Sequence, residues 1–187
     1  MSLSPTLATS RLRLRTMSPM DHGPLYELAM AGEINYLWRF RGSTPSYEQF
    51  VESLQPGVLC QFVVAPKDGE EILGMVVGYN ADMRNRFCYG AACLSAEVTH
   101  SGIGIEAFVL FTKYLFHCWE FRKIYIEASE LNYSQYRSGE ALGVFSVEGR
   151  LSDHMYMAGR FWDQYVLAIH RRDFDKLLEA SFGRLFD

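Results

Sequence analysis

A glycine-containing junction over Thr99–Ala107 is the feature that most constrains how this chain can fold. The segments before it are short apolar runs separated by turn signals, a pattern typical of strands. The period then changes, because apolar residues recur at helical spacing at Ala107, Leu110, Phe111, Tyr114, Leu115 and Cys118. A sheet that leads through Gly102 and Gly104 into a helix over Ile103–Cys118 predicts a mixed fold of strands and helices.

Three strands are expected ahead of this junction, over Leu59–Ala65, Ile72–Tyr79 and Phe87–Leu94. Pro66–Gly69 is a hairpin signal between the first two strands, and a polar connection over residues 80–86 follows the second. Connections this short predict an antiparallel meander.

The N-terminal part of the chain is expected to add an edge strand and two helices. Arginine alternates with leucine in Ser10–Thr16, which predicts one buried face and one solvated face. The solvated face would carry Arg11, Arg13 and Arg15. Asp21 is expected to cap a helix that runs to about Ala31, and Pro45–Leu54 is expected to form a second helix.

Strands and helices are expected to alternate after the long helix. The predicted elements are a strand over Lys123–Ala128, a helix over Ser134–Leu142, a strand pair over Val144–Gly149 and Gln164–Ile169, and a helix over Asp173–Leu185. The helix over Ser134–Leu142 would end at Gly143, a residue common just after a helix C-terminus. The strand pair would surround a turn at residues 157–160.

The composition is that of an average globular domain, with 49% hydrophobic and 21% charged residues among 187. We therefore expect one domain over residues 1–187, with its core over about 9–175. A net charge of −4 offers no surplus of positive charge to a nucleic acid. The sequence has neither a signal-peptide pattern nor a run of about 18 apolar residues, so no membrane partner is expected.

The cysteines also bear on the cellular compartment. They are Cys60, Cys88, Cys93 and Cys118, they lie in apolar runs, and they show no metal-ligand spacing. We expect buried free thiols, no metal site and a reducing, cytoplasmic location.

The junction itself is suited to hold a phosphate group. Its two glycines would let backbone amides approach a ligand, and the helix N-terminus adds unpaired N–H groups and partial positive charge. A diphosphate would fit, although the same glycines could simply form a tight turn. The segment is not a Walker loop, and Ala107 stands where a dinucleotide fingerprint has its third glycine.

The whole pattern resembles the GCN5-related N-acetyltransferase (GNAT) superfamily. The superfamily's diphosphate loop is written Q/R-x-x-G-x-G/A, and residues 99–104 match it at both glycines, with Thr99 in place of Gln or Arg. The next strand is followed in both by an Asn-containing loop and a short helix that ends in glycine, here from Asn132 to Gly143.

Further motifs are similar to those of the RimJ/RimL branch. Residues 10–15, SRLRLR, resemble that branch's T-x-R-L-x-L-R strand, and residues 104–107 resemble its G-x-E-A ending. The segment from Asn132 to Gly143 matches N-x-x-S-x(7)-G, with Gln135 at the Ser position. The tail is also similar, over residues 142–149, 161–167 and 172–174.

The resemblance implies the acyl-CoA N-acyltransferase fold, an α/β or mixed α+β architecture. Its central sheet is mixed but mostly antiparallel, has about seven strands and is flanked by helices. The sheet is open between the fourth and fifth strands, and acetyl-CoA or another acyl-CoA binds there as co-substrate. Leu94 and Ser95 would then offer backbone groups to the pantetheine arm, and Asn132 would contact the cofactor from the other side. The diphosphate would be held by the amides of Thr99, His100, Ser101, Gly102, Ile103, Gly104 and Ile105.

Acyl transfer to an amine requires a base that removes a proton from the nitrogen. Glu127 is our candidate, because it lies five residues before Asn132, where some N-terminal acetyltransferases of the superfamily carry a catalytic Glu. A carboxylate on the solvated face of a strand is the alternative interpretation. The reserve candidates are Glu97, His100 and Asp153.

An acid can assist the departing thiolate, but here the pattern is incomplete. Gly139 occupies the place of a Tyr that many superfamily members carry seven residues after the Asn. Ser134 is our candidate proton donor, Tyr136 and Ser138 are alternatives, and the thiolate could also leave unassisted.

The expected function is transfer of an acetyl group from acetyl-CoA to a primary amine, by direct attack in a ternary complex. The amine would belong to a protein N-terminus or a small molecule, and Tyr36 and Trp38 are candidate substrate contacts. One alternative is a catalytically inactive module that binds acyl-CoA or a partner, and another is an enzyme for longer or carrier-bound acyl groups. Homodimers are common in the resembled branch, which leaves a homodimer open here.

Overall fold

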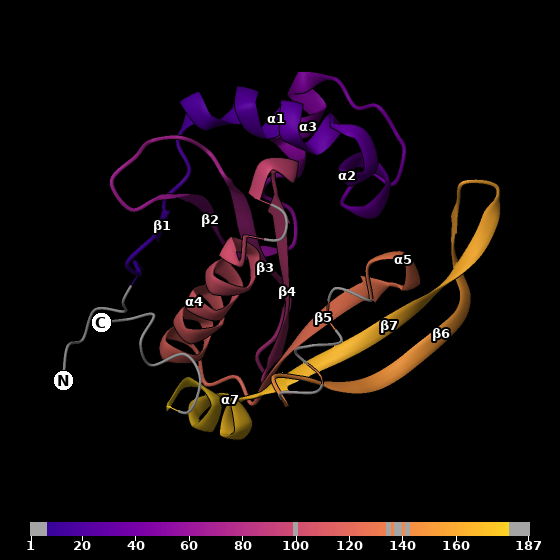
Figure 1. Ribbon diagram of the computed structural model, residues 1–187. Coiled ribbons are helices and arrows are strands. Elements are labelled where there is room, and N and C mark those ends of the chain that lie inside the picture. The colour runs from indigo at the N-terminus through magenta and orange to yellow at the C-terminus, as the bar shows by residue number, and fades with distance from the viewer. Residues whose placement is uncertain (1–6, 99–100, 134–135, 137–139, 141–142, 180–187) are drawn as a thin grey trace.

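The computed structural model describes residues 7–98, 101–133, 136, 140 and 143–179. Within these residues seven strands form one sheet in the order β1-β2-β3-β4-β5-β7-β6 (Figure 1). The strands are β1 (Leu12–Arg15), β2 (Val58–Pro66), β3 (Gly74–Asp82), β4 (Phe87–Leu94), β5 (Lys123–Ser129), β6 (Ser146–Met157) and β7 (Arg160–His170). The helices are α1 (His22–Met30), α2 (Gly32–Leu37), α3 (Tyr47–Ser53), α4 (Ile103–Cys118), α5 (Glu130–Tyr133) and α7 (Arg171–Leu177), with the short 3-10 helices η1 (Pro19–Asp21) and η2 (Ala96–Val98).

The sheet is open between β4 and β5. All other neighbouring strands pair antiparallel, whereas β4 and β5 run parallel and pair only at Phe87↔Lys123, Cys88↔Ile124 and Tyr89↔Tyr125. Beyond these pairs the two strands diverge, so that β1–β4 form one wing and β5–β7 the other (Figure 1). The expected antiparallel meander and the opening between the fourth and fifth strands are therefore both confirmed.

Each face of the sheet has its own apolar core. Helices α4 and α7 pack on one face, and the buried core there includes Phe111, Ile124 and Phe174. The helices α1 and α3 cover the other face, where Phe50 packs against Met75 and its neighbours. Because side chains alternate along a strand, β3 and β4 each present one row of residues to each core, whereas β5 contributes only to the core under α4 and α7.

Helix α4 has the bounds that its apolar spacing predicts. Ala107, Leu110, Phe111 and Leu115 are fully buried, which explains why a helical period appears at this point of the sequence. Its N-cap is Gly102, in the left-handed conformation with φ of 81°.

The N-terminal region differs from the prediction in two respects. Strand β1 lies at the expected edge, and α1 ends at Met30, close to the predicted end at about Ala31. The first difference is α2, which follows in a segment for which no helix was predicted. Asp21 does not cap α1, because its carboxylate accepts hydrogen bonds from Arg15 and from the Ser18 amide instead. This pairing with Arg15 lowers the pKa of Asp21 well below its usual value.

The three arginines of the edge strand do not form a solvated face. Arg15 pairs with Asp21 at 2.7 Å, Arg13 pairs with Glu70, and Arg11 is bonded to the buried Glu106. The partners lie 6 to 95 residues away in the sequence, so strand periodicity could not indicate them.

The C-terminal strands are longer than predicted. Strands β6 and β7 extend to a tight turn at Ala158–Gly159 and project beyond the rest of the sheet (Figure 1). The predicted helix over Ser134–Leu142 lies largely outside the described residues. The C-terminal helix is α7, which begins at Arg171, and the last part of the predicted Asp173–Leu185 also lies outside them.

The cysteines are free thiols, as expected, but not all are buried. Cys88 and Cys93 are buried, Cys60 is half-buried, and Cys118 is exposed. Burial raises the pKa of Cys60, Cys88 and Cys93 to about 12, so these three remain protonated at neutral pH.

Candidate functional site

The junction before α4 forms one end of the opening between β4 and β5. Ser101 ends the approach to the helix, where its hydroxyl donates to the Val98 carbonyl at 2.6 Å and accepts from the Ile103 amide at 3.2 Å. The first bond of the helix runs from the Glu106 amide to the Gly102 carbonyl. The amides of Gly104 and Ile105 therefore precede the helical ladder, in the position where helix N-termini bind anions.

The positive φ of Gly102 is what turns the chain into the helix. A Cβ at Gly102 would meet only the Arg11 guanidinium, at 3.6 Å, so space is not the constraint there. A Cβ at Gly104 would lie 3.0 Å from the Leu94 side chain, so the second glycine is needed for close packing. Gly102 is thus required for its backbone conformation and Gly104 for its small size.

A buried carboxylate anchors this junction to the edge of the sheet. Glu106, with 1% of its side chain exposed, accepts hydrogen bonds from Thr9 and from Arg11 Nε at 2.7 Å. Arg11 also donates to the Ser101 carbonyl at 3.3 Å. The glutamate of the G-x-E-A motif therefore fixes the loop in place rather than facing the opening.

The C-terminal end of β4 borders the opening next to this loop. The Ser95 amide donates to Leu73 at 2.9 Å, on the β3 side, and the Ser95 carbonyl accepts from Val98. Because successive strand residues direct their backbone groups to alternate sides, those of Leu94 face away from β3, toward the opening. Of these two predicted pantetheine contacts, Leu94 has the backbone groups in the better position.

The end of β5 supplies the other side of the opening. Asn132 follows β5 in the short helix α5, and its Oδ1 atom is buried without a hydrogen-bond donor among the described residues. A buried acceptor without a donor is costly, and a ligand N–H would satisfy it. Thr99, His100, Ser134 and Ser138 lie outside the described residues.

A row of aromatic side chains occupies the face of the sheet below the point of divergence. Tyr79, Tyr89 and Tyr125 pair in register on β3, β4 and β5. Their ring centroids lie 5.6 Å apart between Tyr79 and Tyr89, and 5.2 Å apart between Tyr89 and Tyr125. We refer to these three residues as the tyrosine row. Phe87 packs against the end of the row, 5.4 Å from Tyr125.

Glu127 lies just beyond the tyrosine row, where β5 no longer pairs with β4. It is exposed, and its Oε2 atom accepts a hydrogen bond of 3.4 Å from the Tyr79 hydroxyl. No Lys or Arg of the described residues forms an ion pair with it. The structure thus places a carboxylate without a cationic partner beside the opening, as a base for an amine would require.

A second carboxylate at the other end of the row is fully engaged. Glu148 on β6 binds the Lys123 ammonium, accepts from the Tyr125 hydroxyl at 3.0 Å, and lies 3.1 Å from His170 Nε2. Burial alone would raise the pKa of Glu148, but the bonds from Lys123 and Tyr125 outweigh it and lower the pKa. Glu148 therefore holds β6 against β5 and is less available as a base than Glu127.

The predicted substrate contacts lie in different surroundings. Trp38 ends α2 and packs against the core cluster that also contacts Tyr79 and Ala91, with the Arg39 guanidinium 5.4 Å from its ring. Tyr36 is half exposed and lies against Gly42. Trp38 thus packs on the same face of the sheet as Tyr79. Among the described residues, no ring contact or hydrogen bond links Tyr36 to the tyrosine row.

No motif or periodicity in the sequence indicates the tyrosine row. The three tyrosines lie 10 and 36 positions apart in the sequence, and only the strand register brings them together. Tyr136, an alternative proton donor, packs against Phe145, and burial raises the pKa of Tyr136.

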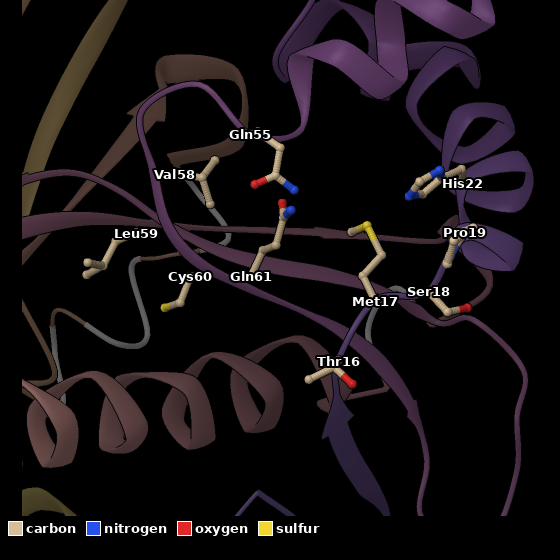
Figure 2. A pocket seen from close by; sticks show the side chains of 10 residues that line it. All are labelled: Thr16, Met17, Ser18, Pro19, His22, Gln55, Val58, Leu59, Cys60 and Gln61. Carbon is tan, nitrogen blue, oxygen red and sulfur yellow. The ribbon is translucent and has the colours of Figure 1, made fainter.

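A cavity of about 350 Å³ lies elsewhere, between the end of β1, the start of α1 and the first half of β2 (Figure 2). The amide groups of Gln55 and Gln61 face one another across it (Figure 2). Of its lining residues only His22 and Cys60 titrate, and none was predicted as a site residue. None of its lining residues carries a carboxylate, in contrast to the opening.

Neither a metal site nor a membrane span is evident in the described part of the chain. No group of three or more His, Cys, Asp or Glu side chains there could hold a metal ion. No described helix has both the length and the apolar character needed to cross a bilayer.

Comparisons with known proteins identify the fold. No protein-family model matches the sequence, and no curated protein is significantly similar to it. Spermidine N-acetyltransferase from Vibrio cholerae, solved in complex with CoA and spermine, matches with a TM-score of 0.78 at 20% identity, over 88% of this chain and 98% of that one. A probable GNAT-family acetyltransferase from Chromobacterium violaceum matches with a TM-score of 0.70 at 18% identity, over 92% and 90% of the two chains. The chain therefore has the GNAT fold, which confirms the predicted fold class.

Proposed function

We propose that this protein is an acyl-CoA-dependent N-acetyltransferase that transfers an acetyl group from acetyl-CoA to a primary amine. The observation that carries the proposal is the opening between β4 and β5, which has the N-terminus of α4 at one end and the unpaired carboxylate of Glu127 at the other. An opening of this kind offers both an anion site and a base. The similar structure from Vibrio cholerae, which contains CoA and spermine, supports a CoA site and an amine acceptor.

The residues around the opening fit acyl-CoA. The amides of Gly104 and Ile105 would bind the diphosphate, and Leu94 would offer its backbone groups to the pantetheine arm. The buried Oδ1 of Asn132 would accept a hydrogen bond from an amide N–H of that arm. Ser101, Ile103 and the predicted contacts Thr99, His100 and Ser95 complete the proposed cofactor-binding set.

Glu127 would act as the base. An amine reacts as the neutral nitrogen, so a carboxylate that accepts its proton raises the rate of attack on the thioester carbonyl. Glu127 is exposed to solvent and can accept a proton from the amine directly or through water. Trp38 would contact the acceptor, and Tyr36 and Ser134 remain candidates from the sequence.

The branch of the superfamily, the cellular location, the assembly state and the acceptor are further parts of the proposal. The motifs over residues 10–15 and 104–107 favour the RimJ/RimL branch, in which homodimers are common. The free cysteines favour a reducing, cytoplasmic location. The acceptor would be a protein N-terminus or a small amine such as a polyamine. The inactive acyl-CoA-binding module and the enzyme for longer or carrier-bound acyl groups are the alternatives to be tested.

Calorimetric titration with acetyl-CoA, CoA and a longer acyl-CoA tests the proposal. We expect micromolar affinity for acetyl-CoA in the unaltered protein and at least a tenfold loss in Gly102→Glu, which places a negative charge at the diphosphate site. Gly159→Glu is the matched control, because Gly159 has nearly the same φ, 82° against 81°, in the β6–β7 turn. It should have the same backbone strain and retain affinity.

Each other result has a defined meaning. Absence of binding to all three ligands would contradict the proposal. Binding without turnover, across a panel of peptides, polyamines and small amines, would favour the inactive module. Preference for the longer chain would favour the enzyme for longer acyl groups.

A further inference from the structure

The hydrogen bond between Tyr79 and Glu127 connects two strands that are not neighbours. Tyr79 lies on β3 and Glu127 on β5, so the bond passes over β4. Tyr79 pairs with Tyr89, and Ala91 is the next β4 residue on the same face. Because Ala91 is small, the Tyr79 side chain has room to reach across β4 to the unpaired part of β5.

This geometry places the Tyr79 hydroxyl at the opening itself. Glu127 lies beyond Tyr125, the last β5 residue that pairs with β4, so a hydroxyl within 3.4 Å of its carboxylate lies where the strands diverge. The bond is exposed rather than enclosed in the core. A bond of this length is weak, so the hydroxyl can turn to a stronger acceptor that enters the opening.

The other two hydroxyls of the tyrosine row are placed differently. The Tyr125 hydroxyl already donates to Glu148 at 3.0 Å, at the far end of the row. The Tyr89 hydroxyl makes no hydrogen bond recorded among the described residues, and Glu127 receives no donor from it. Only Tyr79 therefore connects the row to the proposed base.

The chemistry of the hydroxyl also suits donation. Burial, and then the neighbouring negative charge of Glu127, raise the pKa of Tyr79 well above its usual value. Tyr79 therefore remains a protonated donor across the physiological pH range. A free thiol has a pKa of about 8.5, which is lower than the pKa of a tyrosine. Proton transfer from Tyr79 to the thiolate is therefore unfavourable by itself. It goes to completion only if another group returns a proton to the Tyr79 oxygen.

We propose that Tyr79 donates the proton that the CoA thiolate receives as it departs, and that Glu127 restores the proton to Tyr79. This inference rests on the proposed function. It assigns the role of proton donor to a residue outside the Asn132–Gly143 segment, where Gly139 stands at the usual Tyr position and Ser134 was the candidate. The site already has the base, the donor and the bond between them on one face of the sheet.

The protons and electrons balance within this arrangement. The nitrogen of the neutral amine attacks the thioester carbonyl and forms the C–N bond, and its surplus proton passes to Glu127. The C–S bond breaks, and its electron pair remains on sulfur. The Tyr79 hydroxyl proton passes to that sulfur while the protonated Glu127 returns a proton to the Tyr79 oxygen. The products are the N-acyl amine and the CoA thiol, and both residues regain their starting states.

The first test is an equilibrium measurement that needs no acceptor. The ionisation of the thiol of bound CoA is followed by thiolate absorbance, with the complex of desulfo-CoA as the blank. In Tyr79→Phe the bound thiolate loses a donor, so we expect its apparent pKa to rise by about one, the equivalent of a charged hydrogen bond. Tyr89→Phe, which removes the neighbouring hydroxyl, should change it little.

A second test applies once an acceptor is known. We expect Tyr79→Phe to lower kcat about a hundredfold, as loss of an acid commonly does, without raising the KM for acetyl-CoA. The loss should be smaller for an acyl donor whose leaving thiol is more acidic, because that thiolate needs less assistance. If Tyr79 had a purely structural role, Tyr79→Phe would reduce turnover equally with acetyl-CoA and with the acyl donor that has the more acidic thiol.

The outcomes separate this inference from the proposed function. If CoA does not bind the unaltered protein, both are wrong. If CoA binds but its thiol titrates identically in the unaltered protein and Tyr79→Phe, the role of Tyr79 is wrong and the proposed function stands. Equal shifts in Tyr79→Phe and Tyr89→Phe would also contradict the specific role, since they would indicate a general change in the row.

Discussion

The two ends of the opening between β4 and β5 are built in different ways. At the proposed diphosphate end, consecutive backbone groups around Gly102 and Gly104 form the site, and one buried carboxylate, Glu106, fixes it to the edge of the sheet. At the proposed acyl end, side chains from β3, β4 and β5 meet only because of the strand register. A site formed by local backbone can be recognised in sequence, whereas a site formed by register depends on the whole sheet.

The largest effect is expected at the acyl end, in Glu127→Gln. Loss of a general base commonly lowers turnover by about 10²–10⁴. The side chain is exposed, so the free energy of unfolding should change by less than about 0.5 kcal/mol. The measurements are kcat with the best acceptor of the amine panel and urea unfolding. Unchanged turnover would show that Glu127 is only a solvated strand residue.

At the diphosphate end, Glu106→Ala should act on stability first. It removes the closer acceptor of the buried Thr9 hydroxyl, which then keeps only its 3.3 Å bond to the Leu12 carbonyl, and it leaves Arg11 without its carboxylate partner. We expect a cost of about 2–3 kcal/mol of unfolding free energy. Glu70→Ala is the matched control, because Glu70 pairs with the next arginine of the same strand but is 80% exposed. That control should cost less than about 0.5 kcal/mol, as surface ion pairs do. Equal losses in urea unfolding would show that Glu106 does not anchor the junction.

Features formed by local sequence could be predicted, whereas features that depend on distant segments could not. The long helix and the antiparallel meander were predicted correctly, because apolar period and turn residues act over short distances. The opening was expected from the resemblance to the superfamily, and the short pairing of β4 with β5 agrees with it. The solvated arginine face was wrong, because the carboxylates that pair with Arg11 and Arg13 come from distant segments. The capping role of Asp21 was wrong for a more local reason, since Arg15, six residues earlier, binds its carboxylate.

The candidate site shows the same limit. The glycines of the junction and Glu127 were named from motif and spacing, and the structure places them around one opening. Tyr79 could not be named from the sequence. A tyrosine in an apolar strand run cannot be distinguished from a core residue until the register with β4 and β5 is known. The motif placed the proton donor in the segment that follows Asn132, whereas the donor that we propose, Tyr79, lies on β3.

A moderate effect is expected when the backbone conformation of the junction is disturbed. Gly102→Ala must hold an alanine at a φ of 81°, which should cost about 1–2 kcal/mol. Gly159→Ala imposes the same strain in the β6–β7 turn, where a Cβ would meet nothing within 4 Å. Both should lose similar stability in thermal or urea unfolding, but only Gly102→Ala should also weaken acetyl-CoA binding. Weakened binding in both variants would mean that affinity reports global stability rather than the junction.

The smallest effect concerns Glu148, the carboxylate that binds the far end of the tyrosine row. Its pKa is lowered in the folded protein by Lys123 and Tyr125, so its stabilising contribution is fully present above the pKa of an unfolded glutamate, about 4.3. That contribution is lost as the pH falls through the lower, folded-state pKa. Glu148→Gln should therefore be less stable than the unaltered protein by about 0.5–1 kcal/mol at pH 7, with the difference disappearing below about pH 4. Urea unfolding of both proteins at several pH values measures it, and a difference that stayed constant with pH would show that the glutamate acts by shape and not by charge.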